Sequence, residues 1–360
     1  MRVLVAPDKY AGTLTAPEVA QAIVEGWRAA APEDELDLAP VSDGGPGFVD
    51  VTPGQVRVVT VSGPRGERVA ARLRVDGATA YVESAQACGL HLAAAAVDGT
   101  TYGVGELLRA ALDARAGRIV VGLGGSGTND GGAGMLAALG AVAAGPPRVL
   151  RRGGLALAAL DAVDLTGLDP RLADATLVAA TDVDNPLLGD EGASAVFGPQ
   201  KGATPPQVAA LDAALARWAE LTDPRLAARP GAGAAGGLGF GLFLAGARPE
   251  PGIALVLELL HVPDRAARAD VVITGEGRFD RQSLRGKATV GVAAAARAAG
   301  RPCLVLAGQV GVAGAELAAA GVDAAYAAVD EAGSLDEAFA HPAAHLAALA
   351  ARVARAWSPR

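Results

Sequence analysis

The sequence predicts an α/β protein with two α/β domains, one discontinuous with a mainly parallel sheet, the other inserted with a mixed sheet. Three observations support this prediction. Near both ends of the chain, short apolar runs alternate with helical patterns, which is typical of parallel sheets with crossover helices. From about residue 55, apolar and polar residues instead alternate across two turns, as in antiparallel hairpins. The length of 360 residues suits about two domains.

The first domain is expected to comprise residues 1–54 and 252–360, with residues 55–251 inserted as the second. Its N-terminal part reads as strand, helix, strand. The helix has a recognisable start, because Thr15 can cap it, Pro17 lies in the first turn and Glu18 follows three residues after the cap. The predicted elements are strands Val3–Ala6 and Leu36–Val41 and helix Ala16–Ala30.

The inserted domain begins with hairpins that turn at GPRG and DG and continues with alternating helices and strands. We predict helix Val104–Arg115, strand Arg118–Leu123, a helix from Gly131 to Ala141, strand Thr176–Thr181 and helix Pro206–Leu221.

After about residue 252, near-continuous apolar runs predict buried parallel strands, with helices between them. The predicted strands are Val271–Thr274, Cys303–Ala307 and Ala324–Val329, and the predicted helices are Ala288–Ala299, Gly314–Ala320 and Leu335–Trp357.

Composition narrows the classes of function. The net charge is −8, lysines are scarce and no run of Lys or Arg occurs, so we expect no nucleic-acid partner. The chain starts directly with a strand-like run, and charged residues or glycines interrupt its Ala-rich stretches. We therefore expect a cytoplasmic protein with no signal peptide and no membrane span. Cys88 and Cys303 lie far apart in apolar surroundings and are predicted to be core residues.

Polar loops follow the predicted strands or join the domains. Ligands of open α/β sheets bind beyond the carboxyl ends of the strands, so these loops are the candidate binding segments. They are APDKYAGT (6–13), SDGGPG (42–47), GLGGSGTNDGG (122–132), TDVDNPLLG (181–189), FGPQKGA (197–203) and ITGEGRFD (273–280). A seventh loop is predicted at GAGAAGGLGFG (231–241), which is almost pure glycine and alanine.

The glycine-rich segment 122–132 joins a predicted strand to a predicted helix. Its backbone N–H groups and the helix N-terminus favour a phosphate or a carboxylate. The alternative is a tight turn capped by Thr128, Asn129 or Asp130. The segment has neither the phosphate-binding loop pattern of the Walker type nor the dinucleotide-binding glycine pattern, so neither of those classes is supported.

Acidic side chains follow two of the predicted strands. Asp182, Asp184 and Asn185 suit an oxygen-rich Mg²⁺ site or a base for a hydroxyl group, and an Asx-turn is the alternative. Glu276 and Asp280 follow another strand in the same manner.

The chain has three lysines, Lys9, Lys201 and Lys287. Lys201 and Lys287 both stand beside glycines, which favours contact with an anion over the alternative of a solvated surface lysine.

The chain resembles the bacterial glycerate kinases over nearly its full length. The resemblance rests on long motifs in order, among them VESAQACGL, TTYGVGELL, GGSGTNDGGAGM, TDVDNPLLG, FGPQKGAT and ITGEGRFDRQSLRGKATVGVA. It implies an ATP-dependent kinase acting on D-glycerate, with Mg²⁺ as cofactor and a Rossmann-like first domain. The implied product is 2-phosphoglycerate, with 3-phosphoglycerate as the alternative, and the resemblance leaves a homo-oligomer open.

The polar loops supply a set of predicted site residues for such a kinase. The predicted catalytic residues are Asp182, Lys201 and Lys287. The predicted substrate- and nucleotide-binding residues are Asp8, Lys9, Asp43, Gly124, Gly125, Ser126, Thr128, Asn129, Asp130, Asn185 and Glu276. The predicted metal ligands are Asp184 and Asp280.

Three positions depart from the family pattern, namely Ala11, Pro46 and Phe48. They cluster in the loops of the first domain and support one alternative of a different class, a catalytically eroded homologue that only binds a small acid.

Overall fold

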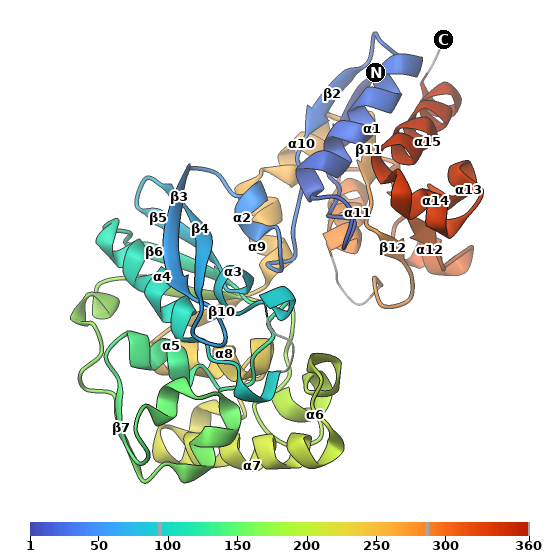
Figure 1. Cartoon of the computed structure of the whole chain (residues 1–360). Coiled ribbons are helices and arrows are strands. Elements are labelled where there is room, and N and C mark those ends of the chain that lie inside the picture. Colours follow the sequence, from blue (N-terminus) through green and yellow to red (C-terminus); the bar gives the residue numbers. More distant parts are fainter. Residues whose placement is uncertain (93–95, 285–287, 359–360) are drawn as a thin grey trace. The chain divides into compact units, whose positions relative to one another are not determined.

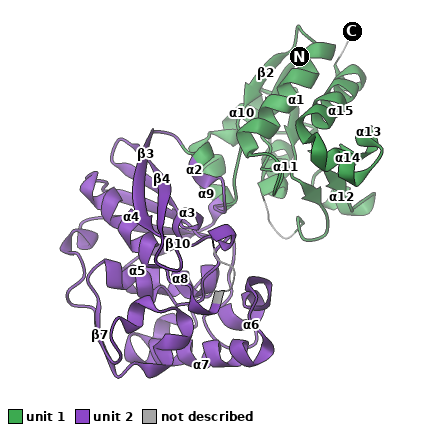
Figure 2. Ribbon diagram, in the orientation of Figure 1, with its two compact units in different colours: residues 1–43, 50–52, 253–360 green, residues 44–49, 53–252 purple. Residues whose placement is uncertain are grey.

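The computed structural model describes residues 1–92, 96–284 and 288–358 (Figure 1). The chain forms two compact units (Figure 2): unit 1 contains residues 1–43, 50–52 and 253–360, and unit 2 contains residues 44–49 and 53–252. Both units are α/β, which confirms the predicted fold class. Among the described residues, no helix is long and apolar enough to cross a membrane.

Unit 1 is built on a sheet of five parallel strands in the order β15-β13-β11-β1-β2. If these strands are counted along the chain within the unit, the order is 2-1-3-4-5, a doubly wound order whose ligands bind between the first and third strands. The strands are β1 (Arg2–Val5), β2 (Glu35–Leu38), β11 (Val271–Thr274), β13 (Cys303–Ala307) and β15 (Ala324–Ala327), with the small pair β12 (Arg278–Phe279) and β14 (Gln309–Val310) beside them.

Helices cover both faces of this sheet. The helices are α1 (Ala16–Ala30), α9 (Gly252–Leu259), α10 (Val262–Arg268), α11 (Ala288–Ala298), α12 (Ala315–Ala319), α13 (Val329–Ala332), α14 (Leu335–Ala340) and α15 (Pro342–Trp357), and α2 (Phe48–Val51) crosses the boundary between the units. Helices α1 and α15 share one core with alternate residues of β11, whereas α11 packs on the sheet from the other face. A Cβ on Gly26 would lie 1.9 Å from the Ala347 carbonyl oxygen, so glycine is what lets these two helix backbones meet.

Helix α1 spans the predicted residues because its start signal works as predicted. The Thr15 N–H donates to Glu18 Oε2 (2.8 Å), and the Glu18 N–H donates to Thr15 Oγ1 (3.4 Å). This reciprocal capping satisfies two backbone donors that the helix cannot pair internally.

The single helix predicted over Leu335–Trp357 was wrong. The structure has two helices there, α14 and α15, and the break falls at His341. Pro342 has no N–H to donate to the preceding turn, so α14 ends and the proline becomes the first residue of α15.

Unit 2 contains a mixed sheet in the order β10-β9-β6-β5-β4-β3. Strands β3, β4 and β5 form the predicted antiparallel hairpins, and β5, β6, β9 and β10 pair in parallel. The strands are β3 (Gln55–Ser62), β4 (Arg68–Asp76), β5 (Thr79–Glu83), β6 (Arg118–Gly122), β9 (Thr176–Ala180) and β10 (Arg248–Glu250), with a separate hairpin of β7 (Val142–Ala144) and β8 (Ala162–Asp164).

The helices of unit 2 pack around one large apolar core with the sheet. They are α3 (Ala85–Cys88), α4 (Tyr102–Asp113), α5 (Ala133–Ala138), α6 (Ala193–Phe197), α7 (Pro205–Leu221) and α8 (Ala234–Leu244). Short 3-10 helices occur at Leu90–Leu92, Ala96–Asp98, Val149–Arg151, Gly154–Ala159, Pro170–Ala173, Pro199–Lys201 and Pro224–Leu226. Cys88 in this unit and Cys303 in unit 1 are both buried, which confirms that they are core residues.

The predicted loop at 231–241 was also wrong over most of its length, because residues from Ala234 onward are helical. Helix α8 begins with a distorted turn in which Ala235, Gly236 and Gly237 have positive φ. A Cβ on Gly236 would lie 2.0 Å from the Thr128 carbonyl oxygen. The glycines therefore serve close backbone packing against the segment before α5, and not an open loop.

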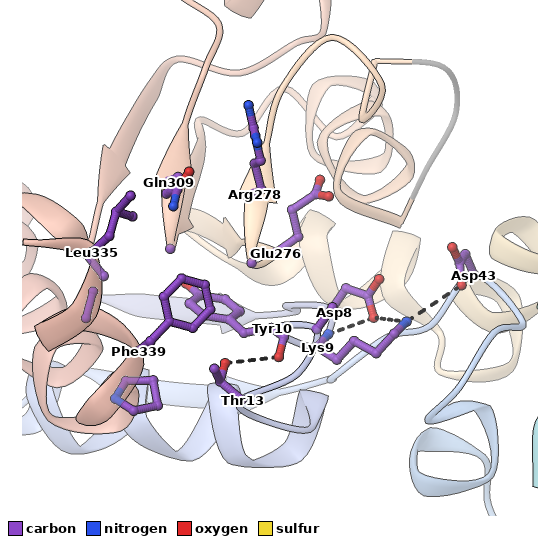
Figure 3. Close-up of a pocket in the computed structure, with 16 residues that line it drawn as sticks. Asp8, Lys9, Tyr10, Thr13, Asp43, Glu276, Arg278, Gln309, Leu335 and Phe339 are labelled. Atoms are coloured by element: carbon purple, nitrogen blue, oxygen red, sulfur yellow. Dashed lines mark hydrogen bonds and ion pairs between the residues drawn. The ribbon is translucent and has the colours of Figure 1, made fainter. Parts of the chain in front are cut away.

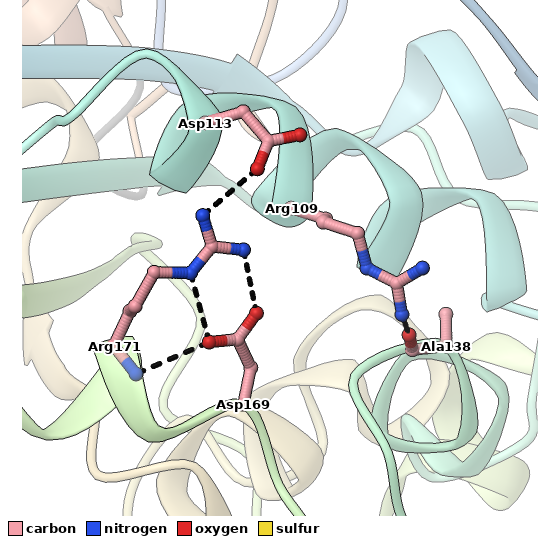
Figure 4. A network of polar contacts seen from close by, with 5 residues as sticks. All are labelled: Arg109, Asp113, Ala138, Asp169 and Arg171. Atoms are coloured by element: carbon pink, nitrogen blue, oxygen red, sulfur yellow. Dashed lines mark hydrogen bonds and ion pairs between the residues drawn. The ribbon is translucent and has the colours of Figure 1, made fainter.

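A network of polar contacts on unit 2 ties α4 to neighbouring segments (Figure 4). Arg171 pairs with Asp113 of α4 at 2.8 Å and with Asp169 at 2.7 Å, and this guanidinium lowers the pKa of Asp169. Arg109 of α4 donates to the Ala138 carbonyl oxygen at the end of α5. Arg171 and Asp113 are exposed, so each pair contributes little to stability.

Candidate active site

Unit 1 has a cavity of about 400 Å³ at the carboxyl ends of its parallel strands (Figure 3). The segments that follow β1, β11, β13 and β15 all contribute to its wall, so the cavity includes the switch point between β1 and β11. It is lined by Asp8, Lys9, Tyr10, Ala11, Thr13, Asp43, Glu276, Gly277, Arg278, Gly308, Gln309, Ala328, Leu335, Ala338, Phe339 and Pro342.

One end of this cavity carries a charged group of side chains. Lys9 Nζ lies 3.5 Å from Asp8 Oδ1 and 3.9 Å from Asp43 Oδ1. Burial raises the pKa of Asp8 to about 6; Lys9 opposes this rise, whereas the negative charges of Asp43 and Glu276 add to it. Tyr10 forms part of the buried floor, where its hydroxyl donates to the Leu306 carbonyl oxygen (2.8 Å). The structure thus brings four predicted binding residues, Asp8, Lys9, Asp43 and Glu276, to one cavity.

Asp280 takes a different position from Glu276, although both follow β11. Its Oδ2 pairs with Arg278 Nε (3.1 Å), and its Oδ1 accepts from the Gln282 N–H (2.8 Å). It does not line the cavity. Lys287, the other predicted residue of this segment, lies outside the described residues.

In unit 2, the glycine-rich loop follows β6 and packs against the segment that contains Pro46. The Gly124 N–H donates to the Gly44 carbonyl oxygen (3.3 Å), and a Cβ on Gly124 would lie 2.3 Å from the Gly45 Cα. Gly125 has φ +69°, and a Cβ there would lie 2.5 Å from Pro46 Cγ. Glycine is therefore required at 124 and 125 so that the two polar loops can touch.

Lys201 lies beneath this loop and is buried. Its Nζ donates to Ser126 Oγ (2.9 Å) and to the Thr128 carbonyl oxygen (2.7 Å). Burial lowers the pKa of Lys201 to about 8, and the negative charge of Asp130 opposes this shift. The ammonium therefore remains mostly protonated near neutral pH and places a positive charge directly under the loop.

Asp130 uses its carboxylate to hold the loop and the start of α5. Its oxygens accept from the Gly132 and Gly134 N–H groups (3.2 Å each), and from the N–H (2.8 Å) and hydroxyl (2.9 Å) of Thr101. The anion at this helix end is therefore the side chain of Asp130 itself. Burial raises its pKa, although these hydrogen bonds favour the charged form.

Asn129 also points into the buried part of this loop. Its Nδ2 donates to Ser194 Oγ of α6 (2.9 Å). Its Oδ1 is buried and makes no hydrogen bond within the described residues. Thr128 is likewise buried, so the structure gathers Ser126, Thr128, Asn129 and Lys201 around the glycine-rich loop.

The loop 181–189 follows β9, the parallel neighbour of β6, so it lies at the same edge of the sheet. Asp182 and Asp184 are exposed. Asn185 stabilises the loop, because its Nδ2 donates to the Glu191 carbonyl oxygen (2.8 Å). Asp184 belongs to unit 2 and Asp280 to unit 1, so the two predicted metal ligands come from different units.

Sequence reasoning missed the apolar part of the cavity in unit 1. Leu335, Phe339 and Pro342 line it, but all three fall inside the single helix predicted over Leu335–Trp357. Gln309 was missed too, because a lone glutamine after a strand carries no chemical signature. Only the unusual exposure of Phe339 would have pointed to a binding surface, and exposure is not visible in a sequence.

Comparison with known proteins agrees with this architecture. A model of the glycerate kinase family matches residues 3–358. The chain is 42% identical to the glycerate 2-kinase of Escherichia coli (94% of this chain, 93% of the relative) and 42% identical to the glycerate kinase of Bacillus subtilis (96% and 95%). A crystal structure of a glycerate kinase 2 candidate from Salmonella typhimurium LT2 superimposes with a TM-score of 0.82 at 40% identity, covering 99% and 98% of the two chains.

The two α/β units with polar loops at the strand ends, together with these matches, define the protein as a kinase. The chain belongs to the glycerate kinase family. The resemblance deduced from its motifs is thereby confirmed.

Proposed function

We propose that this kinase transfers the terminal phosphoryl group of ATP to D-glycerate and forms 2-phosphoglycerate. The names of its relatives support glycerate as the acceptor, and the name of the Escherichia coli relative supports the 2-hydroxyl. The observation that carries the proposal is the buried ammonium of Lys201 beneath the glycine-rich loop.

Phosphoryl transfer depends on positioning and charge neutralisation more than on covalent chemistry. Lys201 supplies a positive charge that its hydrogen bonds to Ser126 and Thr128 hold in one place. A preorganised charge of this kind stabilises an anion without reorganisation at the moment of reaction. In this proposal Lys201 and the loop stabilise the anionic groups of the substrates.

Asp182 is proposed as the base that accepts the proton of the attacking hydroxyl. It is exposed at the strand end beside the glycine-rich loop, which leaves it accessible to a substrate. Asp184 stays a proposed ligand of the metal ion, and Lys287 stays a proposed partner of the transferred group.

The residues present fit a Mg²⁺ ion that arrives with the nucleotide. Among the described residues, no group of three His, Cys, Asp or Glu side chains could hold a metal ion by itself. Mg²⁺ needs only one or two carboxylates when phosphate oxygens and waters complete its shell, and it would neutralise phosphate charge there. Asp8, Asp43 and Glu276 offer such oxygens in unit 1, and Asp184 offers one in unit 2.

No specific observation favours the eroded binding protein. Phe48 is buried and its ring meets Tyr81 edge-on at 6.2 Å, so it serves the core. Pro46 covers Gly125, and Lys201 keeps its partners beneath the loop. Ala11 lines the cavity of unit 1, whose wall keeps Asp8, Lys9, Asp43 and Glu276.

A coupled assay of ADP release tests the proposal. We expect ADP only when Mg·ATP and D-glycerate are both present, and phosphorus NMR should identify 2-phosphoglycerate. A product that is only 3-phosphoglycerate would correct the position of transfer and keep the activity. No D-glycerate-dependent ADP release would refute the proposed reaction.

A further inference from the structure

The cavity of unit 1 differs chemically between its two ends, as Figure 3 shows. Asp8, Lys9 and Asp43 form the charged end already described. Leu335 and Phe339 lie at the other end, on α14, and belong to the same cavity wall. Because residues four apart share one face of a helix, α14 presents both side chains together.

These two side chains are unusually exposed for their size. Phe339 is 59% exposed and Leu335 is 47% exposed, although most large apolar side chains of the unit are buried. A single exposed apolar residue needs no explanation, but here both belong to a cavity with charged groups at its other end. The cavity therefore offers a ligand one flat apolar surface and one polar surface.

Gln309 adds a hydrogen-bonding group beside this apolar surface. It follows β13 and lines the same cavity, and Figure 3 shows it on the side of Leu335 and Phe339. Its side-chain amide can both donate and accept hydrogen bonds.

The two substrates of the proposed reaction differ in the contacts that they could make with the apolar end of this cavity. Glycerate is a three-carbon acid with no flat apolar surface, so it gains nothing from a phenylalanine ring. A nucleotide has an aromatic base at one end and charged phosphates at the other. Bases stack on aromatic side chains, and polar groups in a pocket then fix their orientation.

We propose that this cavity binds the nucleoside part of ATP, with the adenine base on Phe339 and Leu335 and the Gln309 amide at the edge of the base. The phosphates then run toward Lys9 and Arg278. This inference rests on the proposed function, since it assigns one of its two substrates to unit 1. The position agrees with the general rule for the 2-1-3-4-5 sheet, whose crevice lies at the switch between β1 and β11.

The test compares Phe339→Ala with Phe339→Tyr in the full-length protein. Binding of Mg·ATP is measured by isothermal titration calorimetry without glycerate, and KM is measured for each substrate. We expect Phe339→Ala to raise the Kd and KM for ATP about tenfold or more, and KM for D-glycerate by less than about twofold. Phe339→Tyr should keep the affinity for ATP, because a tyrosine ring stacks equally well.

Two further variants complete the design. Gln309→Ala should reduce the preference for ATP over CTP, because it removes the group that contacts the base edge. Val58→Ala is the matched control: Val58 is 66% exposed but lies on β3 of unit 2, so ATP binding should not change. Melting temperatures of all variants should stay near that of the wild type, since the altered side chains are not core residues.

A Phe339→Ala variant with unchanged ATP affinity would overturn the assignment, and so would one whose main defect is in KM for D-glycerate. A wild-type protein that binds no ATP in calorimetry would overturn it as well. If the protein binds ATP through Phe339 but does not phosphorylate D-glycerate, the nucleoside site stands and the proposed reaction fails.

Discussion

The two units place polar loops at the carboxyl ends of their strands, yet they use these loops differently. Unit 1 leaves a cavity of about 400 Å³ whose wall combines carboxylates, a lysine and apolar side chains. In the glycine-rich loop of unit 2, the protein's own groups take the positions of ligands: the Asp130 carboxylate holds the start of α5, and Lys201 holds Ser126. The loops at the ends of parallel strands can thus either line an open cavity, as in unit 1, or hold a charged side chain in a fixed position, as in unit 2. In unit 2 the close packing of glycines favours the second arrangement.

Removal of the buried positive charge in unit 2 should have the largest effect. Lys201→Met should lower kcat by about 10²–10³-fold, the scale of losing one preorganised electrostatic group. It should also cost about 1–3 kcal/mol of stability, because the Thr128 carbonyl oxygen loses its donor. Steady-state kinetics and thermal denaturation measure the two effects.

Ser126→Ala serves as the control for Lys201→Met, since it removes one hydrogen bond and keeps the charge. A loss below about tenfold is expected for it. If Ser126→Ala is as damaging as Lys201→Met, the hydrogen bond and not the charge is what the loop needs.

Asp182→Asn should lower kcat by about 10²-fold, as expected for loss of a positioned base. The side chain is exposed, so the melting temperature should barely change. Asp190→Asn, in the same exposed segment, is the control and should keep the wild-type kcat. A normal kcat for Asp182→Asn would assign this residue to the turn alone.

The pH dependence of kcat/KM should reveal one titrating group from each unit. Burial raises the pKa of Asp8 to about 6 and lowers that of Lys201 to about 8, so both are charged between these values. We expect kcat/KM to fall below about pH 6, where Asp8 is protonated, and above about pH 8, where Lys201 loses its proton. Asp8→Asn should abolish the acid limb only; an unchanged acid limb would show that another group titrates there.

The same pKa shifts have opposite consequences for stability. The stability that protonated Asp8 contributes is present below its unfolded pKa of 3.8 and is lost as pH rises through about 6. Lys201 binds its proton more weakly in the folded state, so its contribution rises with pH from about 8 to its unfolded pKa of 10.5. Urea unfolding of wild type and Asp8→Asn from pH 4 to 7 checks the first of these statements.

Gly124→Ala should disturb the contact between the two polar loops of unit 2. The new Cβ would lie 2.3 Å from the Gly45 Cα, so the backbone must shift, at a cost of about 1–3 kcal/mol. Gly117→Ala is the matched control, since its Cβ would lie 4.0 Å from its nearest neighbour, the Ala78 carbonyl oxygen. Equal melting temperatures for both variants would contradict the packing argument.

The smallest effect is expected on the surface of unit 2. Asp113→Ala removes an exposed partner of Arg171 and should change stability by less than about 1 kcal/mol. Asp174→Ala, at an exposed aspartate that follows the short helix Pro170–Ala173, provides the comparison in urea denaturation. A larger loss for Asp113→Ala would mean that the network in Figure 4 acts as one unit.

Local patterns were enough to predict much of the fold. The apolar runs of the parallel strands and the Thr15–Glu18 capping pair are short-range signals, and each lies where it was expected. Helix α8 could not be predicted, because its glycines serve contact with a distant segment and glycine by itself indicates a loop.

The sequence was enough to predict which residue types belong to the candidate site, but not what each residue does there. Strand-end carboxylates and Gly-flanked lysines are visible in a sequence, but burial is not. Capping by Asp130 was the alternative that the sequence offered for this loop, and the structure has it, but the contacts of Asp130 with Thr101 and the burial of Lys201 appear only in three dimensions. The exposure of Phe339 depends on where α14 ends, which is a tertiary property.

The position of β1 has a consequence for biosynthesis. This strand pairs with β2 on one side and with β11 on the other, and more than two hundred residues separate β2 from β11 in the chain. A ribosome that adds about 5–20 residues per second needs roughly 10–50 s to reach β11. During that interval most of the residues of unit 2 emerge and can fold, while β11, the second partner of β1, has not yet been made. The apolar face of α1, which includes Trp27, stays without its final packing partner for longer, until the helix α15 has been made.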